Sequence, residues 1–413
     1  PTKLRLGELV DVDITSGAPL QFDLIKETDT DRMVNPDTLT APYISRLNVR
    51  GGRDTEARFD MRVILTGEGD PRATLGSFRA ETGEGVSVDI TGPAGNIDFK
   101  GAVTDAVFTF SETVKRVSVG AATNVIFDAI NEFAANITIK GTCDGVAELF
   151  AARRSLAVKA NRRVDGAAGA GDLKNVDLET ADPAGESPAR QAVGRIRVDG
   201  NMQDVMLTDP DAEGGGVGAF EARGDITNTT VTSAGAELKS FKGEHVTNSN
   251  VTAGQTGKID VDSWDGGDIL LRVLKSLKSR GTRTAPGDFL IDTFRITGDP
   301  DARSAFGSAN IDGTIDGMFH IVGPTGNQKV GDVASTFNQV VEGDVKSFRS
   351  SAALRGTLAA HSFGKVDAKT DADNLHLAVG GDISGAGASG GNLLDTFLNS
   401  FRIGGNFIMS LVE

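Results

Sequence analysis

The stretch IDFKGAV at residues 97–103 decides the fold of this chain. It is followed 20 residues later by VSVG at 117–120, and after another 20 residues by ITIKGTC at 137–143. Similar stretches, which alternate apolar with polar residues, recur further on as IRVDGNM at 196–202, FEARGDI at 220–226 and FRIGGNF at 401–407. An alternation with a period of two is typical of half-buried strands and not of helices.

Each of these stretches has a second half, in which a small or amide residue precedes an apolar residue by three places. Four such pairs are Asp105 with Phe108, Asp204 with Leu207, Asn228 with Val231, and Asn374 with Leu377. The repeating unit is therefore a strand, a bend, a second strand and a corner. We expect Asn228, Asn248 and Asn374 at or near the bend, because asparagine tolerates left-handed backbone.

A strand of this length cannot bury one face alone, but stacked copies share an apolar interior. We therefore predict an all-β fold, a parallel β-helix (β-solenoid) with rungs of about 20 residues. Right-handed winding is favoured by its frequency among parallel crossovers. Equivalent rung positions are filled by Val103, Cys143, Met202 and Ile226, and we expect all four side chains to point inward. Cys143 is the single cysteine, so we interpret it as a small buried hydrophobe.

Regularity varies along the chain. Residues 1–81 carry strand signals at uneven spacing and are predicted to form an N-terminal β cap or lead-in module, followed by the solenoid over 82–413. Loop excursions are predicted near 161–191 and 380–392, which are rich in small and polar residues. The segment Asp268 to Arg280 fits either a short helix or a rung. We favour the rung, because LKSLK at 274–278 resembles VKSFR at 345–349.

The charge and the hydrophobicity of the chain argue against nucleic-acid binding and against a transmembrane helix, respectively. The formal net charge is −15 and the calculated pI about 4.8. The richest basic stretch, Lys275 to Arg283, is dispersed among neutral residues, so we expect no nucleic-acid binding. No stretch approaches the ~20 apolar residues of a membrane-spanning helix, so no transmembrane segment is expected.

Candidate catalytic groups are scattered. His245, His320, His361 and His376 fall in different rungs. Acid pairs that could serve a glycosidase or hold calcium, but are more typical of turns, are Asp29/Asp31, Asp209/Asp211, Asp260/Asp262, Asp299/Asp301 and Asp371/Asp373. Trp264 is a candidate carbohydrate-stacking platform, and Gly214 to Gly216 lack the Lys-Ser/Thr of a phosphate loop. We predict no catalytic, cofactor-binding or metal-binding residues and no cofactor, with structural calcium at a loop left open.

The rungs at Ile196 to Asp209, Phe220 to Ser233 and Phe401 to Leu411 resemble the Gly-Asp-Ile type β-helix repeats of large bacterial surface and secreted proteins, including those of planctomycetes. They are also similar to adhesin and autotransporter passenger domains, and the likeness covers about residues 95–413. It implies a non-catalytic structural or adhesive protein that is extracellular or on the bacterial cell surface. The alternative is a polysaccharide-binding or polysaccharide-cleaving enzyme, because pectate-lyase-like enzymes are similar in architecture.

The two ends of the sequence give a further expectation. The chain begins at Pro1 without a methionine, which is typical of a processed form or a piece of a longer protein. Its last rung carries Phe401, Ile403, Phe407, Met409 and Leu411. A bare apolar rung recruits other chains, so we expect it to be covered by another subunit, in a homo-oligomer or filament, or by a continuation of the chain. A carbohydrate or other cell-surface ligand is a further possible partner.

Overall fold

The structure is a computed structural model that describes residues 2–6, 10–15, 21–23, 38–51, 58–68, 73–129, 136–145, 155–159, 171–179, 193–209, 216–233, 237–299, 302–380, 398, 400–405, 407–408 and 411–412. The regular secondary structure of these residues consists of β-strands, without any helix, so the predicted all-β class is confirmed. The chain divides into two compact units, Pro1–Val217 and Gly218–Glu413.

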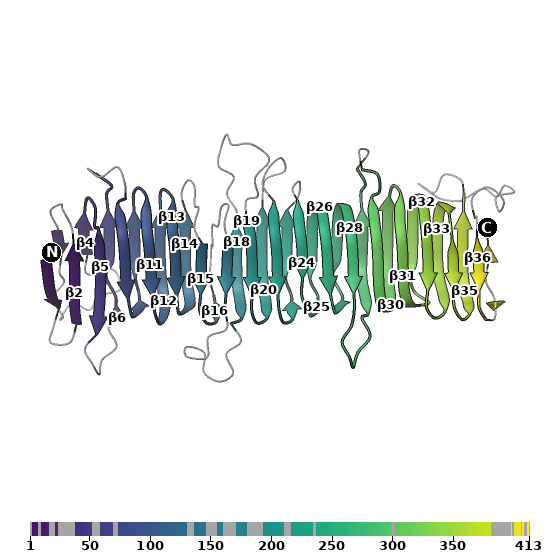
Figure 1. The fold of residues 1–413 in the computed structure, drawn as a ribbon, viewed down its shortest axis with the longest axis horizontal. Helices are drawn as coiled ribbons and strands as arrows, with labels where there is room; N and C mark the ends of the chain where they lie inside the picture. The colour runs from purple at the N-terminus through teal and green to yellow at the C-terminus, as the bar shows by residue number, and fades with distance from the viewer. Residues whose placement is uncertain are drawn as a thin grey trace. The chain divides into compact units, whose positions relative to one another are not determined.

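The first unit runs from purple to teal in Figure 1. Its strands are β1 Thr2–Leu6, β2 Val10–Thr15, β3 Gln21–Asp23, β4 Thr38–Ala41, β5 Arg46–Gly51, β6 Arg58–Phe59, β7 Arg62–Leu65, β8 Leu75–Ala80, β9 Thr82–Glu84, β10 Ser87–Ile90, β11 Ala94–Phe99, β12 Ala102–Phe110, β13 Val114–Val119, β14 Ala121–Ala129, β15 Asn136–Ile139, β16 Cys143–Asp144, β17 Ser155–Val158, β18 Leu173–Glu179, β19 Val193–Val198 and β20 Met202–Asp209.

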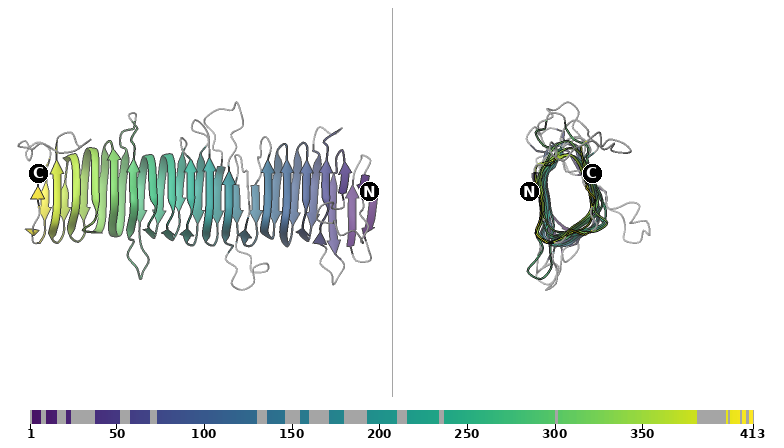
Figure 2. Two further views of the ribbon diagram at one scale, coloured as in Figure 1. Left: turned by 180° about the vertical axis from the view of Figure 1, so that it is seen from behind. Right: turned by 90° about the vertical axis from the view of Figure 1, so that its right-hand side faces the viewer.

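The second unit runs from teal to yellow, and its strands stand side by side in Figure 1 and, seen from behind, in Figure 2. After β21, Val217–Ala222, which starts at the boundary, the strands are β22 Ile226–Thr227, β23 Thr230–Ser233, β24 Leu238–Lys242, β25 His245–Thr247, β26 Asn250–Val261, β27 Ser263–Asp265, β28 Asp268–Ser279, β29 Phe289–Ile296, β30 Phe306–Val322, β31 Thr325–Val333, β32 Asn338–Ser350, β33 Leu354–Phe363, β34 Val366–Ala368, β35 Ala372–Val379, β36 Phe401–Ile403, β37 Phe407–Ile408 and β38 Leu411–Val412.

Strand pairing changes from antiparallel to parallel near the start of the first unit. β1 with β2, β2 with β5 and β3 with β4 are antiparallel. β4 with β7 and β5 with β8 are already parallel, and parallel pairing continues from there. Parallel pairs thus occur on both sides of residue 81, and the boundary between lead-in module and solenoid stays a prediction, as does the hand of winding.

The predicted inward column is confirmed in each unit separately. In the first unit the register runs from Val103 through Ala122, Cys143 and Leu173 to Met202, and every one of these side chains is buried. In the second unit Ile226 is paired with Val246, and both are buried. Within each unit these successive members are 19 to 30 residues apart in sequence, because insertions at corners lengthen some rungs without disturbing the column.

The ambiguous segment 268–280 is a rung, as favoured. It lies in β28, whose residues pair in parallel with β26 before it and with β29 and β30 after it. Leu274 is in register with Phe306, Thr325 and, one rung further, Val345, which is the equivalence suggested by the two related pentapeptides. The segment is paired with neighbouring strands along its length, and Leu274 and Leu277 are buried as in the other rungs, so a helix is excluded.

The prediction of a loop over 161–191 was wrong for residues 173–179. They form β18, in which Leu173, Val176 and Leu178 are buried and pair with Met202, Val205 and Leu207. Because the flanking residues are polar, the sequence did not indicate this strand of the rung. The rest of that range, apart from 171–172, and residues 381–392 of the second predicted excursion lie outside the described residues.

Aromatic side chains form a continuous contact chain inside each unit. In the first unit the ring centroids of Phe78 and Phe99 are 5.1 Å apart, and those of Phe108 and Phe127 are 5.1 Å apart and stacked. In the second unit Phe294 lies 4.6 Å from Phe319. Each fully buried aromatic side chain contributes roughly 1.5–3 kcal/mol by leaving water, so these contacts stabilise neighbouring rungs against each other.

Candidate functional site

The bends are built from residues that accept left-handed backbone. All positive-φ residues other than glycine in the described ranges are asparagine or aspartate, namely Asp105, Asn124, Asn175, Asp204, Asn228, Asn248 and Asn374, with φ between 46° and 52°. The expected positions of the three asparagines are confirmed. Side chains bridge successive bends: Asn124 Nδ2 donates to Asp105 Oδ1 at 3.0 Å, and Asn175 Nδ2 donates to Asp144 Oδ1 at 2.7 Å. These amides maintain the bend and are not available as a ligand site.

Two side chains proposed as reactive or ligand-binding belong to the interior. Cys143 is 1% exposed, and the pKa of its thiol is raised by burial and by the neighbouring Asp144 carboxylate, which confirms it as a core residue. Trp264 is fully buried between Val246 and Phe289 in the inward column, and its Nε1 donates to the Gly266 carbonyl at 2.9 Å. The suggested carbohydrate platform at Trp264 was therefore wrong, because its strand parity directs the indole inward.

The histidines pair with carboxylates or hydroxyls of neighbouring rungs. His320 Nε2 lies 2.7 Å from Glu342 Oε1, and His245 Nδ1 lies 2.7 Å from Ser263 Oγ. At a third place Asp344 Oδ1 is 3.1 Å from His361 Nδ1 and accepts a bond from Ser362 Oγ at 2.6 Å. Ser362 thus bonds the acid and not the imidazole, whereas a nucleophile needs its base within reach. The half-buried His376 lies between the buried Leu375 and Leu377, as expected for an outward position.

The acid pairs are divided among separate structural roles. Asp209 is buried and its Oδ2 accepts a bond from the Gly216 amide at 3.1 Å, while Asp299 pairs with Arg272 at 3.2 Å. Asp29, Asp31, Asp211 and Asp301 lie outside the described residues. Nowhere in the described ranges do three or more His, Cys, Asp or Glu side chains gather in a way that could hold a metal ion.

Asp260 is the acid with the most distinctive surroundings. Its side chain is 12% exposed and forms ion pairs with Lys258 and with Arg280, whose Nε lies 3.3 Å from Asp260 Oδ1. Lys258 and Asp260 share a strand, and Arg280 follows the next strand in register. A carboxylate and two cations therefore meet on one sheet face of the second unit.

That sheet face is basic over most of its length. It consists of the segments Leu238–Lys242, Thr256–Asp260, Leu274–Lys278, Phe306–Asn310, Thr325–Lys329, Val345–Arg349 and Phe363–Asp367, with Phe401 and Arg402 in register with the last of them. We call this surface the basic face. In each segment the first and fourth residues are buried, and the second, third and fifth residues, which we call the outer positions, are half-buried or exposed except for Ser347 and Asp260.

Ten cations occupy these outer positions of the basic face, against two carboxylates. The cations are Lys239, Lys242, Lys258, Lys275, Lys278, Lys329, Lys346, Arg349, Lys365 and Arg402, and the carboxylates are Asp260 and Asp367. The net charge of −15 is therefore not distributed evenly over the surface of the chain. A linear scan finds no basic run because register brings together residues that lie a rung or more apart in sequence.

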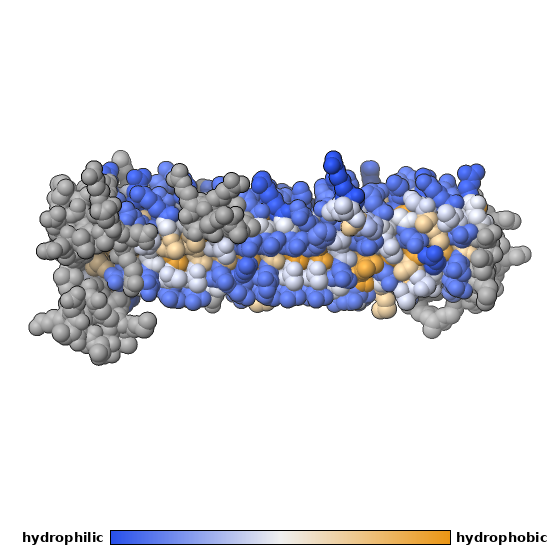
Figure 3. Space-filling view, turned by 90° about the horizontal axis from the view of Figure 1, so that it is seen from below, coloured by the Kyte–Doolittle hydropathy of each residue, from blue (hydrophilic) through white to orange (hydrophobic). Residues whose placement is uncertain are grey.

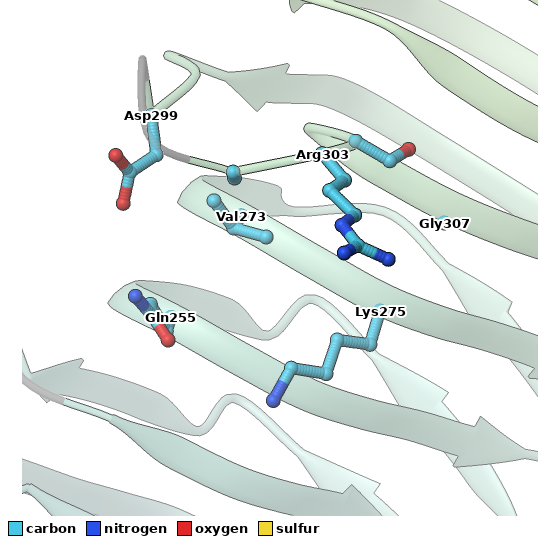
Figure 4. A pocket seen from close by; sticks show the side chains of 8 residues that line it. Gln255, Val273, Lys275, Asp299, Arg303 and Gly307 are labelled. Atoms are coloured by element: carbon cyan, nitrogen blue, oxygen red, sulfur yellow. The ribbon is translucent and has the colours of Figure 1, made fainter.

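A pocket of about 410 Å³ adjoins the basic face (Figure 4). It is lined on β26, β28 and β30 by Gln255, Val273, Lys275 and Gly307, and on the preceding loop by Asp299, Ala302, Arg303 and Ser304. Arg272 holds the Asp299 carboxylate, and Ser304 Oγ donates to the carbonyls of Phe306 and Pro324 at 2.8 and 3.0 Å. Lys275 and Arg303 remain as exposed cations at the pocket, and neither has an ion pair among the described residues.

The surface of the second unit is otherwise mixed. In Figure 3, where this unit is on the right, blue hydrophilic residues surround a strip of white and orange ones. Large exposed apolar side chains of this unit are Leu270 and Met318, 39% and 59% exposed, and both lie on strand segments outside the basic face. The described part of the chain contains no helix that could cross a bilayer.

Comparisons with protein families, with characterised proteins and with solved structures found no match to this chain. The fold class is a β-solenoid of about 14 turns. The Gly-Asp-Ile repeat type and the bacterial-surface setting rest on the sequence resemblance alone.

Proposed function

We propose that this chain is a non-catalytic structural or adhesive protein of the bacterial cell surface or exterior, which uses its outer sheet surfaces as extended binding surfaces. The observation that carries the proposal is the basic face, on which outward side chains of like character recur in register over eight strands of the second unit. A solenoid repeats one outer position at each rung, about 4.8 Å from the next. Such a surface suits a long or repetitive partner better than a single small substrate.

Two measurements test this proposal. Antibodies against the purified chain should label intact cells of the source bacterium without permeabilisation. Acidic and neutral cell-wall polysaccharides incubated with the chain should keep their chain length, as measured by size-exclusion chromatography with light scattering. Labelling that requires permeabilised cells would contradict the surface location, and shortened polymers would contradict the non-catalytic role.

A specific observation favours the alternative, a polysaccharide-cleaving enzyme. Lys258, Asp260 and Arg280 form a cluster of Asp, Lys and Arg on one sheet, the kind of residue set that serves catalysis in pectate-lyase-like enzymes. If the chain eliminated across a uronate, the product would carry a conjugated double bond that absorbs in the ultraviolet. An increase in this absorbance with the wild-type chain, lost in Asp260→Asn, would establish the alternative. No increase with either protein supports the structural role.

The proposal includes self-assembly, which has support of a different kind. Leu270 and Met318 expose apolar surface on another strand layer of the second unit. In the final rung Phe401 and Ile403 are half-buried, Phe407 and Leu411 lie in β37 and β38, and Met409 lies outside the described residues. Sedimentation velocity and electron microscopy over a concentration series should show oligomers or filaments that diminish in Leu270→Asn with Met318→Gln. A monomer at every concentration would contradict assembly.

A further inference from the structure

The basic face carries positive charge that its own carboxylates do not neutralise. Lys258 and Lys365 form ion pairs with Asp260 and Asp367 on their own strands. Six further lysines on this face have no ion pair among the described residues: Lys239, Lys242, Lys275, Lys278, Lys329 and Lys346. Because the whole chain has a net charge of −15, this surplus is a local feature and not a reflection of composition.

Cations of three neighbouring rungs act on the Asp367 carboxyl. The pKa of the Asp367 carboxyl is lowered, first by its hydrogen bond with Lys365 and then by the charges of Lys365, Arg402 and Arg349. Arg349 and Arg402 are the register neighbours of Asp367 on either side. The Asp367 carboxylate is therefore surrounded by cations from three consecutive rungs, which favour its charged form.

The residue types of the face indicate which class of partner it fits. Protein interfaces have an apolar centre with large aromatic or aliphatic anchors, and single-stranded nucleic acids require aromatic platforms for base stacking. The aromatic residues of this face, Phe241, Phe306, Phe348 and Phe363, are buried, and Phe401 is half-buried. The outer positions hold lysine, arginine, serine, asparagine and glycine, together with Asp260 and Asp367. Point charges and small polar groups suit a hydrated polymer with repeated anionic groups.

We infer that the basic face binds an anionic polysaccharide, one with carboxylate or sulfate groups along its chain, lying along the stacking direction of the rungs. This inference rests on the proposed adhesive function and names its ligand class. Outer positions of adjacent rungs are about 4.8 Å apart, so an extended polymer meets successive cations of one column. Lys275 belongs both to the face and to the adjoining pocket, where Arg303 adds a second cation, so a sugar side group enters there.

The test uses immobilised full-length chain and four polymers: polygalacturonate, dextran sulfate, neutral dextran and duplex DNA. Binding is followed by biolayer interferometry at about 0.02 M and about 0.5 M salt, where screening differs several-fold in range. Lys329→Glu and the double variant Lys329→Glu with Lys346→Glu remove exposed cations of the face. Arg295→Glu is the matched control, because Arg295 is exposed in the same unit but lies on β29, in register with Leu270 and His320.

We expect polygalacturonate, dextran sulfate or both to bind the wild-type chain at low salt and to dissociate at high salt, with neutral dextran not binding. Lys329→Glu should weaken binding about threefold or more and the double variant roughly tenfold, whereas Arg295→Glu should change it less than about twofold. Circular dichroism and melting curves of each variant establish that the fold is retained.

Other outcomes overturn the inference. Equal losses in Lys329→Glu and Arg295→Glu would show that total charge and not this face governs binding. Binding of neutral dextran would exclude the charge-based mechanism, and DNA that binds as tightly as the best polysaccharide would replace the ligand class. No binding of either anionic polysaccharide would also refute it. A chain that labels intact cells but binds neither polymer refutes only the ligand, whereas a chain absent from the cell surface refutes the proposed function.

Discussion

Replacing Phe294 by alanine tests whether the aromatic contacts hold the rungs of the second unit together. The Phe294 side chain is fully buried, and its ring centroid lies 4.6 Å from Phe319, 5.4 Å from Phe306 and 6.3 Å from Phe289. Truncating a buried phenylalanine costs about 3–5 kcal/mol, and three aromatic neighbours place this site toward the upper end. We therefore expect Phe294→Ala to lower the free energy of unfolding by about 4 kcal/mol.

The assay exploits the single tryptophan of the chain. Trp264 is fully buried, and its ring centroid lies 5.9 Å from that of Phe289, which in turn contacts Phe294. Its fluorescence during urea unfolding therefore reports on this part of the stack. With a slope of about 3 kcal/mol per M, a loss of 4 kcal/mol lowers the midpoint by more than about 1 M. Phe294→Leu, which preserves most of the apolar volume, should cost about 1–2 kcal/mol.

Arg295→Ala serves as the control, because Arg295 is adjacent on the same strand but exposed, and it should stay within about 0.5 kcal/mol of wild type. A cost below about 1.5 kcal/mol for Phe294→Ala would refute the packing described for this position. Equal costs for Phe294→Ala and Arg295→Ala would refute the strand parity itself, since one of the two side chains must then point the other way.

Three further predictions use the same unfolding assay. Asn248, with φ of 46°, should tolerate Asn248→Gly within about 0.5 kcal/mol, while Asn248→Val should lose about 2 kcal/mol because a β-branched residue is strained in left-handed backbone; equal effects would contradict the bend geometry. Gln339 is buried and its amide has no hydrogen-bond partner among the described residues, so Gln339→Leu should stabilise by about 1–2 kcal/mol, and a loss of stability would reveal a partner for the amide. The pKa of Asp344 is lowered by hydrogen bonds from Ser362 and His361, so its stabilising effect is present above its unfolded pKa of about 3.9 and is lost as the pH falls through the folded value. Asp344→Asn should therefore destabilise at pH near 6 and much less at pH near 2, and a cost independent of pH would exclude ionisation as the cause.

The inward positions could be predicted from the sequence because packing restricts them. In the inward column of the first unit every residue in register is apolar, so Val103, Cys143 and Met202 reveal their equivalence even across insertions of different length. Trp264 obeys the same rule through its register with the buried Val246 and Phe289, but the break at Asp262 shifts the strand parity, so counting alternate residues from Ile259 and Val261 would have placed its indole outward. β18 was not predicted because the residues before and after it, within 161–191, are mostly small and polar and obscure the alternation of its seven residues.

The basic face could not be found by scanning for charge runs, because outer positions are not restricted by packing and their partners are defined by register alone. The signal was nevertheless present in the resemblance between LKSLK at 274–278 and VKSFR at 345–349. Extending the comparison to LKSFK at 238–242 gives three segments with a cation at the second and fifth places. The charge on the surface of a solenoid can therefore be predicted only after the rungs are aligned, because the alignment defines which outer residues are neighbours.

Backbone packing limits how many cations the second position of the basic face can carry. A Cβ atom at Gly257 would lie 2.4 Å from the Lys239 carbonyl oxygen, one at Gly307 2.3 Å from that of Lys275, and one at Gly364 2.6 Å from that of Lys346. Real Cβ atoms do not approach a carbonyl this closely, so each lysine at the second position is followed by a glycine in the next rung. Lysines at this position therefore cannot occupy consecutive rungs.

The fifth position has no such restriction. Lys329 and Arg349 occupy it in consecutive rungs, and Lys242, Lys278 and Arg402 continue the column. The fifth position therefore carries five cations together with both carboxylates of the face, Asp260 and Asp367, whereas the second position carries three lysines that are separated by glycines. If an anionic polysaccharide follows the face, its strongest contacts at the fifth position lie at Lys329 and Arg349, where cations occupy consecutive rungs, and Lys275 at the second position holds a branch beside the pocket.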